Sequence, residues 1–133
     1  MTEPPRPDAF LAACPSRTVL ARLGDKWTLL VLARLASAPS RFGQLRRAVD
    51  GVTQKMLTQT LRHLERDGLV ARTVISTRPL QVDYALTPAG RELSRLVRPL
   101  KAWAECHLHD VTASNSRFDR ARDAEARRGR GAP

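Results

Sequence analysis

The stretch Thr53–Val70, TQKMLTQTLRHLERDGLV, decides the fold. Thr53 is a typical helix N-cap and Gly68 a typical helix terminator, so the sequence predicts one amphipathic helix between them. The apolar face of this helix consists of Met56, Leu57, Thr60, Leu61 and Leu64. The opposite face is polar and cationic and consists of Gln54, Lys55, Thr58, Gln59, Arg62 and Arg66.

Downstream of Gly68, the hydrophobic period changes from that of a helix to that of a strand. The segments 69–76 (LVARTVIS) and 81–87 (QVDYALT) both alternate between apolar and polar residues. Thr77-Arg78-Pro79-Leu80 joins them, with Arg78 near the tip of the connection. The pattern predicts a β-hairpin directly after the amphipathic helix.

Upstream of Thr53, the chain is patterned for three further helices. Ser16 is a plausible cap for the first, the second stops before Pro39, and Ser40 is expected to cap the third. In the third, Phe42, Leu45 and Val49 are spaced to face inward, and a turn at Asp50-Gly51 follows. The three helices are expected over residues 17–23, 28–37 and 41–49.

A long helix is expected after the hairpin, with Thr87 as N-cap and Pro88 at its first position. It extends roughly to Val111, with a kink at Pro99 because proline removes a backbone hydrogen bond. Its apolar stripe is longer than a domain of this size can cover, so we expect it to pair with a second copy of the chain. Packing of the stripe on its own domain stays open as the alternative. The predicted dimer residues are Leu93, Leu96, Val97, Leu100, Trp103 and Leu108.

The order of elements predicts a mostly α fold with a small β-hairpin wing. This is a winged helix-turn-helix with a long C-terminal dimerisation helix. The expected domain organisation has a flexible, proline-containing arm over 1–13 and the winged helix over 14–112. An Arg-rich, disordered tail is expected over 113–133.

Composition limits the function classes. The chain has 133 residues, 23 Lys+Arg against 13 Asp+Glu and a net charge of +10, which favours a polyanionic partner. A hydrophobic content of 42% supports a folded core, and no apolar run is long enough for a membrane span. The N-terminus lacks a secretion-signal pattern, and two cysteines are too few for a disulfide framework, so a cytoplasmic protein is expected.

The helix expected over 54–67 has the chemistry needed to read double-stranded DNA. Glutamine suits the adenine edge, lysine and arginine suit guanine, and threonine suits a base edge or a phosphate. In a winged helix, this helix enters the major groove, and the hairpin covers the neighbouring backbone or minor groove. The predicted DNA-binding residues are Arg41, Gln44, Thr53, Gln54, Lys55, Thr58, Gln59, Arg62, Arg72 and Arg78.

Several segments together resemble the HxlR-type regulators, winged-helix bacterial transcription factors related to the MarR class. The resemblance covers about 14–108 in consistent order. It implies a homodimer that binds a roughly palindromic operator. For the protein as a whole, we expect a transcriptional repressor. The hairpin turn, Arg78-Pro79-Leu80-Gln81, departs from the Pro-Pro-Arg type of turn common in that family. The matching segments are Cys14-Pro15, GDKWTL (24–29), RFGQL (41–45), KMLTQTL (55–61), LERDGLV (64–70), VDYALT (82–87) and LKAW (100–103).

Two interpretations of Cys14 stay open. Its place at the start of a helix favours a thiolate, and the resemblance implies a sensor of oxidants or electrophiles. The alternative is an inert, packed cysteine. Cys106, His107 and His109 do not form a convincing metal site, because zinc usually needs four ligands and a partner pair is lacking.

No catalytic constellation or phosphate-binding loop is evident, so neither an enzyme nor a cofactor is expected. A small-molecule or electrophile effector is compatible with the sequence. Two rival functions remain at this stage: a winged-helix module that docks an acidic protein, and a non-specific nucleic-acid-binding protein driven by the Arg-rich tail.

Overall fold

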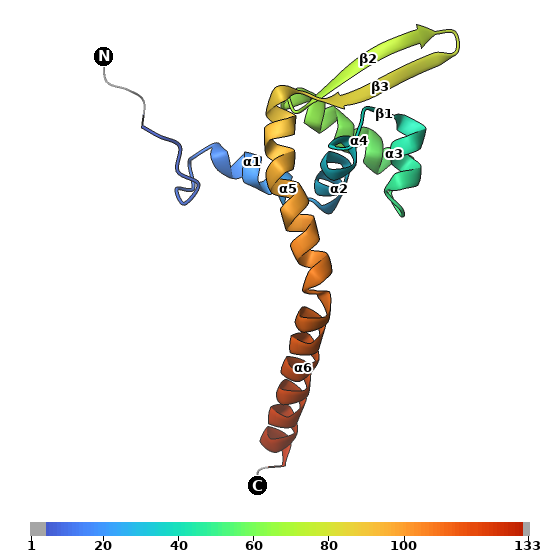
Figure 1. Cartoon of the computed structure of the whole chain (residues 1–133). Coiled ribbons are helices and arrows are strands. Elements are labelled where there is room, and N and C mark those ends of the chain that lie inside the picture. The colour runs from blue at the N-terminus through green and yellow to red at the C-terminus, as the bar shows by residue number, and fades with distance from the viewer. Residues whose placement is uncertain (1–4, 132–133) are drawn as a thin grey trace. The chain divides into compact units, whose positions relative to one another are not determined.

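The computed structural model describes residues 5–131. The chain divides into two compact units, one ending at Arg98 and the other beginning at Pro99. The first unit contains the four helices that precede the hairpin, the hairpin itself and the beginning of the helix that follows it (Figure 1). The winged-helix fold class predicted from the sequence is confirmed, with the addition of one short strand.

Four helices precede the hairpin: α1 (Ser16–Leu23), α2 (Lys26–Leu35), α3 (Phe42–Ala48) and α4 (Gln54–Arg66). Asp25 caps α2, its carboxylate accepting a hydrogen bond from the Trp27 N–H at 3.1 Å. Thr53 caps α4 as predicted, because its hydroxyl oxygen accepts from the Met56 N–H at 3.1 Å. Helix α4 ends before Gly68, whose φ of +76° is a conformation that favours glycine.

The sheet has three antiparallel strands in the order β1-β3-β2. They are β1 (Ser40–Arg41), β2 (Val70–Thr77) and β3 (Leu80–Leu86). The prediction that Ser40 caps α3 is wrong, because Ser40 pairs with Tyr84 in β1 and Arg41 stands at the N-cap instead. A strand this short leaves no alternation in the sequence, so only its pairing with β3 reveals it.

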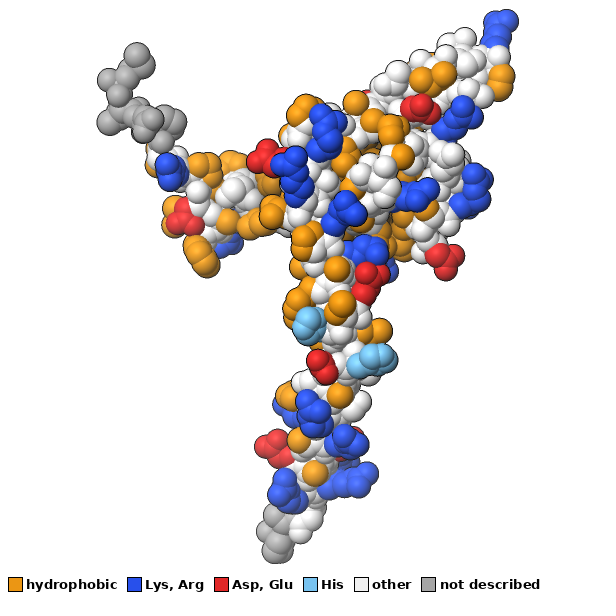
Figure 2. Space-filling model, viewed as in Figure 1, with side chains coloured by type: hydrophobic (Ala, Val, Ile, Leu, Met, Phe, Trp, Pro, Cys, Tyr) orange, Lys and Arg blue, Asp and Glu red, His pale blue; other side chains and the backbone are white. Residues whose placement is uncertain are grey.

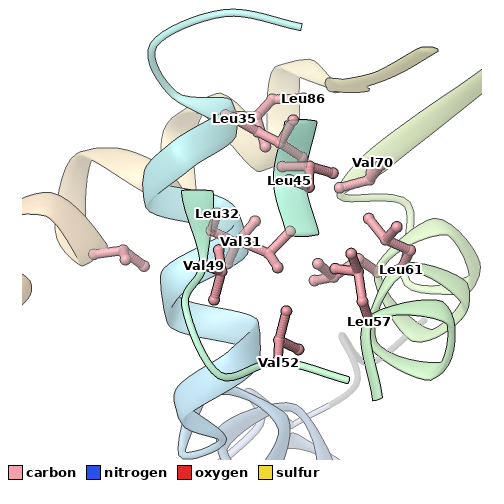
Figure 3. Close-up of a cluster of buried hydrophobic side chains, with 12 residues drawn as sticks. Val31, Leu32, Leu35, Leu45, Val49, Val52, Leu57, Leu61, Val70 and Leu86 are labelled. Carbon is pink, nitrogen blue, oxygen red and sulfur yellow. The ribbon is translucent and has the colours of Figure 1, made fainter. Parts of the chain in front are cut away.

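The core of the first unit is aliphatic and is drawn in Figure 3. Leu32 of α2, Leu45 of α3 and Leu57 of α4 have no exposed surface, so the three helices close on one another. Phe42 and Met56 pack partly buried against this cluster. The cluster consists of Val31, Leu32, Leu35, Leu45, Val49, Val52, Leu57, Leu61, Leu64, Val70, Leu86 and Val97.

Helix α5 (Pro88–Cys106) begins as predicted, with the Gly90 N–H donating to the Thr87 hydroxyl at 3.1 Å. The single helix expected as far as Val111 is instead interrupted at His107, after which α6 (Leu108–Arg130) begins. Pro99 lies inside α5 without ending it. The kink expected there stays a prediction.

The disordered tail expected from residue 113 onward differs from the structure, in which α6 continues to Arg130. Alanine and arginine are good helix formers, and no proline or glycine occurs in α6 before Gly129, which explains the helix.

At the other end of the described chain, the guanidinium of Arg17 donates to the carbonyls of Ala9 and Phe10 at 2.8 and 2.9 Å. Residues 1–4 of the predicted arm and 132–133 of the tail lie outside the described residues.

Candidate nucleic-acid interface

The polar face of α4 is a continuous, solvent-accessible surface. Its apolar face is held in the core by Leu57 and Leu64, both completely buried, so the opposite side must face outward. The predicted residues Gln54, Lys55, Thr58, Gln59 and Arg62 all line one open hollow of about 860 Å³. His63 and Arg66 line the same hollow. The sequence placed Arg66 on this face, but Arg66 was not among the predicted DNA-binding residues.

The two predicted threonines have different hydrogen-bonding capacity left for a ligand. Thr53 Oγ1 accepts from the Met56 N–H, which leaves its hydroxyl proton available. Thr58 Oγ1 donates to the Gln54 carbonyl at 2.8 Å, so its hydroxyl is left as an acceptor. Thr53 therefore suits a phosphate oxygen, and Thr58 suits a base amino group.

The turn between α3 and α4 fixes how the two helices meet. Gly51 has φ of +86°, a left-handed conformation that side chains other than glycine rarely adopt. Val49 and Val52 on either side of it are buried in the core. The turn predicted at Asp50-Gly51 is thus present, and it anchors α4 at its N-terminal end, beside the residues predicted to read bases.

Arg41 and Gln44 lie at the start of α3, and both are engaged within the chain. The Gln44 side-chain oxygen accepts from the Arg41 backbone N–H at 2.8 Å, so only its amide NH₂ remains to donate. Arg41 Nε lies 3.7 Å from Asp83 Oδ1, across the β1–β3 pairing. Both side chains are substantially exposed, so this ion pair is weak and leaves the guanidinium able to exchange partners. Asp83 was not among the predicted site residues, since only the register of β1 brings it to Arg41.

The wing consists of β2 and β3, and it carries the other two predicted arginines. Arg72 stands opposite Tyr84 in the middle of the hairpin, and Arg78 lies in the turn; both are exposed. Lys and Arg side chains are spread over the first unit and its wing (Figure 2). The surface therefore offers cations both on α4 and on the wing.

Cys14 lies just before α1, and its thiol contacts a hydroxyl. The Sγ atom is 3.0 Å from Ser16 Oγ. The side-chain hydrogen bond from Ser16, followed by that from its backbone, lowers the pKa of Cys14 below the ordinary thiol value. An open, mainly apolar groove of about 620 Å³ runs past Cys14 and is lined by Leu11 of the arm and Val19 of α1, among others. An accessible thiol of lowered pKa is the arrangement that reactive cysteines share.

The six predicted dimer residues do not share one environment. Val97 is 3% exposed and belongs to the core cluster of the chain itself, so its assignment to the dimer face is corrected. Leu93 is half-buried against the same cluster. The remaining four, Leu96, Leu100, Trp103 and Leu108, are more than half exposed. The first turns of α5 are therefore used by the chain's own core, as the alternative interpretation expected, and the later turns are not.

Within residues 5–131, none of the helices is both long and apolar enough to cross a membrane. The same residues bring together no group of three or more side chains of the types that hold metal ions.

The helical order, the exposed polar face of α4 and the wing define the class of protein: a winged helix-turn-helix regulator. Residues 22–112 match the family described as HxlR-like helix-turn-helix, and the chain belongs to this family. It is a helix-turn-helix transcriptional regulator, as the resemblance in the sequence indicated.

Known proteins agree with this assignment. The chain is 41% identical to the uncharacterized HTH-type transcriptional regulator YtfH of Escherichia coli K12, over 78% of this chain and 82% of that protein. The solved structure of ytfH from Salmonella typhimurium is 39% identical and has a TM-score of 0.79, covering 84% of this chain and 99% of that one. The redox regulator HypR in its oxidized form is 39% identical with a TM-score of 0.64, over 70% and 96% of the two chains.

Proposed function

We propose that this chain is a cytoplasmic, homodimeric repressor that binds a palindromic operator. In this proposal, α4 lies in the major groove, where Gln54, Lys55, Gln59 and Arg62 contact base edges. Arg41 and the wing arginines Arg72 and Arg78 hold the flanking backbone or minor groove. Two copies place their α4 helices on half-sites about one turn of duplex apart.

The observation that supports the proposal most is that the polar side chains of α4 are exposed and gathered on one side of the helix. Five predicted base-reading and phosphate-binding residues lie together on one open face, while the other face of the same helix packs into the core, with Leu57 and Leu64 completely buried. Among the described residues, no carboxylate forms an ion pair with Lys55, Arg62 or Arg66. These cations are free to meet phosphates or guanine edges.

Capture of genomic fragments by the purified full chain tests the proposal. We expect enrichment of a few fragments that share an inverted repeat, in the presence of excess unrelated duplex. Enrichment without any shared sequence would favour a non-specific nucleic-acid-binding protein. Failure to retain duplex at low salt would favour a module that docks an acidic protein, and either result would overturn the proposal.

The proposed dimer uses the exposed apolar side chains of α5. Leu100 is 53% and Trp103 55% exposed, and the Trp103 ring stacks on the His107 ring with their centroids 4.5 Å apart. Large apolar residues exposed at helical spacing are typical of a surface that pairs with a partner. A second copy fits, because a two-fold interface presents the same stripe from both sides.

Introduction of a charge into this stripe is expected to separate the subunits. L100E should halve the mass measured by analytical ultracentrifugation, since two buried carboxylates would face each other across the two-fold axis. A102E is the matched control, because Ala102 is also exposed and lies on the other side of α5. A monomeric wild type, or equal dissociation by both variants, would contradict the proposed face.

We also propose that Cys14 is the point at which a redox or electrophile signal enters. The lowered pKa of its thiol and the groove beside it support this role. The similar protein HypR is described as a redox regulator and has been solved in an oxidized form. A modified Cys14 would alter the contacts of the segment that precedes α1.

The Ser16 hydroxyl should control the reactivity of Cys14. In the wild type, alkylation by iodoacetamide is expected to rise with pH at a lower midpoint than in S16A, because the hydrogen bond stabilises the thiolate. Mass spectrometry of the alkylated peptides measures both rates, and Cys106 in the same chain is the internal reference. Identical pH profiles for wild type and S16A would show that Ser16 does not activate the thiol.

A further inference from the structure

Helix α6 lies mostly outside the part of the chain that matches the family, which ends at residue 112. It is 23 residues long and has no buried residue. A helix without packing depends on its own propensity, and a length near 23 residues is only modestly stable in water. Any function of α6 therefore depends on its exposed side chains.

The charges of α6 are unevenly distributed around its axis. At 3.6 residues per turn, Arg117, Arg120, Arg127 and Arg128 fall within an arc of about 100°. After Asp110, the only other residues in that arc are Ala113 and Ala124, whose small side chains leave the arginines unobstructed. The acidic residues that follow Asp110 lie outside it: Asp119, Asp123 and Glu125. We call the four arginines the arginine face.

The opposite side of α6 has a different character. It carries Val111 and Phe118, which are 45% and 63% exposed. The Arg122 guanidinium lies over the Phe118 ring, 5.8 Å from its centroid, and forms a cation–π interaction with it. Basic side chains cluster along the later turns of α6 in Figure 2. The helix is thus divided into a cationic and a partly apolar side.

We propose that the arginine face of α6 binds the phosphate backbone of duplex DNA, as a second contact in addition to α4 and the wing. This inference rests on the proposed function of the chain. The occupant is a polyanion because the arc contains four cations and no anion after Asp110. Within residues 5–131, no ion pair joins an arginine of α6 to a carboxylate, so the guanidinium groups are not neutralised within the chain.

Helix stability alone does not explain the pattern. Cations in the last turn favour the helix dipole, which accounts for Arg127 and Arg128. Arg117 and Arg120 lie in the middle of the helix, where the dipole contributes little. Arg117 and Arg120 are aligned with the arginines of the last turn. Such a row of cations matches a ligand that carries negative charges along its length.

The dimensions fit a duplex. Arg117 and Arg128 are about 16 Å apart along the helix axis at 1.5 Å per residue. Duplex DNA carries one phosphate per ~1.7 Å of its axis. A stretch of this length therefore has more phosphates than the helix has guanidinium groups, wherever along the duplex α6 binds. Such a contact carries no sequence information. It raises affinity for all duplexes and lets the regulator search along DNA.

The test compares two double variants that remove the same charge from the same helix. R117Q/R120Q lies on the arginine face and R122Q/R130Q lies off it. Glutamine keeps nearly the helix propensity of arginine, and circular dichroism verifies that helicity is retained. The probe is an unrelated duplex of four turns, about 40 base pairs. Affinity is measured as a function of salt by fluorescence anisotropy.

We expect R117Q/R120Q to weaken binding and to reduce the slope of log affinity against log salt by about 2, at ~0.9 per phosphate contact. R122Q/R130Q should change the slope by less than half as much. Equal slopes for the two variants would show a general charge effect, and an unchanged slope for R117Q/R120Q would show no contact; both overturn the inference. If R117Q/R120Q instead changes the mass measured by sedimentation and leaves the salt slope unchanged, the arginine face is a subunit interface, and the inference is overturned.

Failure of this inference is distinguishable from failure of the proposed function. If the face variants keep the wild-type slope while the wild type still selects an inverted repeat, only the role of α6 is wrong. If the wild type does not bind duplex at all, both are wrong.

Discussion

Replacement of both Lys55 and Arg62 by alanine is expected to remove most of the preference for the captured operator over unrelated DNA. Each side chain in contact with a guanine edge contributes about 1–3 kcal/mol of discrimination, so the pair accounts for most of a modest specificity ratio. Both side chains are exposed and form no ion pair among the described residues, so the fold should keep its stability within about 0.5 kcal/mol. Competition binding against unrelated duplex measures the ratio.

The control for this pair must remove the same charge from elsewhere on the first unit. R34A/R95A does so, since Arg34 of α2 and Arg95 of α5 are exposed and outside α3, α4 and the wing. The control should weaken operator and unrelated duplex alike and keep the ratio. If K55A/R62A behaves like R34A/R95A, α4 does not read bases, and the proposed docking of this helix is wrong.

The elements that could be predicted from the sequence are those whose signals are local. Helix α4 has its cap at Thr53, its terminator at Gly68 and its apolar spacing within one short stretch, and all three are confirmed. The exposed polar face of α4 followed directly, because burial of one face of a helix exposes the other.

Two of the features that were missed depend on pairing or packing between distant segments, and the third depends on local composition. Strand β1 exists only because Ser40 and Arg41 pair with Tyr84 and Asp83 of β3. A strand of two residues has no alternating pattern from which this pairing could be predicted. Val97 lies on the same apolar stripe as Leu100, and the sequence alone does not show where the chain's own core ends along α5. Helix α6 was mistaken for a disordered tail because its charges suggested disorder, whereas its alanine and arginine content favours a helix.

Replacement of Gly90 by alanine is expected to destabilise the first unit severely. An added Cβ at this position would lie 2.0 Å from the Leu69 carbonyl oxygen and 3.3 Å from Leu86 Cδ2. Alanine normally stabilises a helix by about 1 kcal/mol relative to glycine, so any loss of stability comes from this contact. The expected loss is about 3 kcal/mol or more. Urea unfolding followed by tryptophan fluorescence measures it.

The contact cannot be relieved cheaply because the Leu69 carbonyl is fixed. It accepts a hydrogen bond from the Thr87 N–H at 3.1 Å, and the Thr87 hydroxyl donates to the Gly68 carbonyl at 2.6 Å. These bonds join the end of α4, the base of the wing and the start of α5, so movement away from a new Cβ would disturb all three. G129A is the control, since nothing lies within 4 Å of a Cβ at Gly129. A G90A variant with the wild-type midpoint would show that α5 does not approach Leu69 this closely, and the position of the wing relative to α4 would then need another explanation.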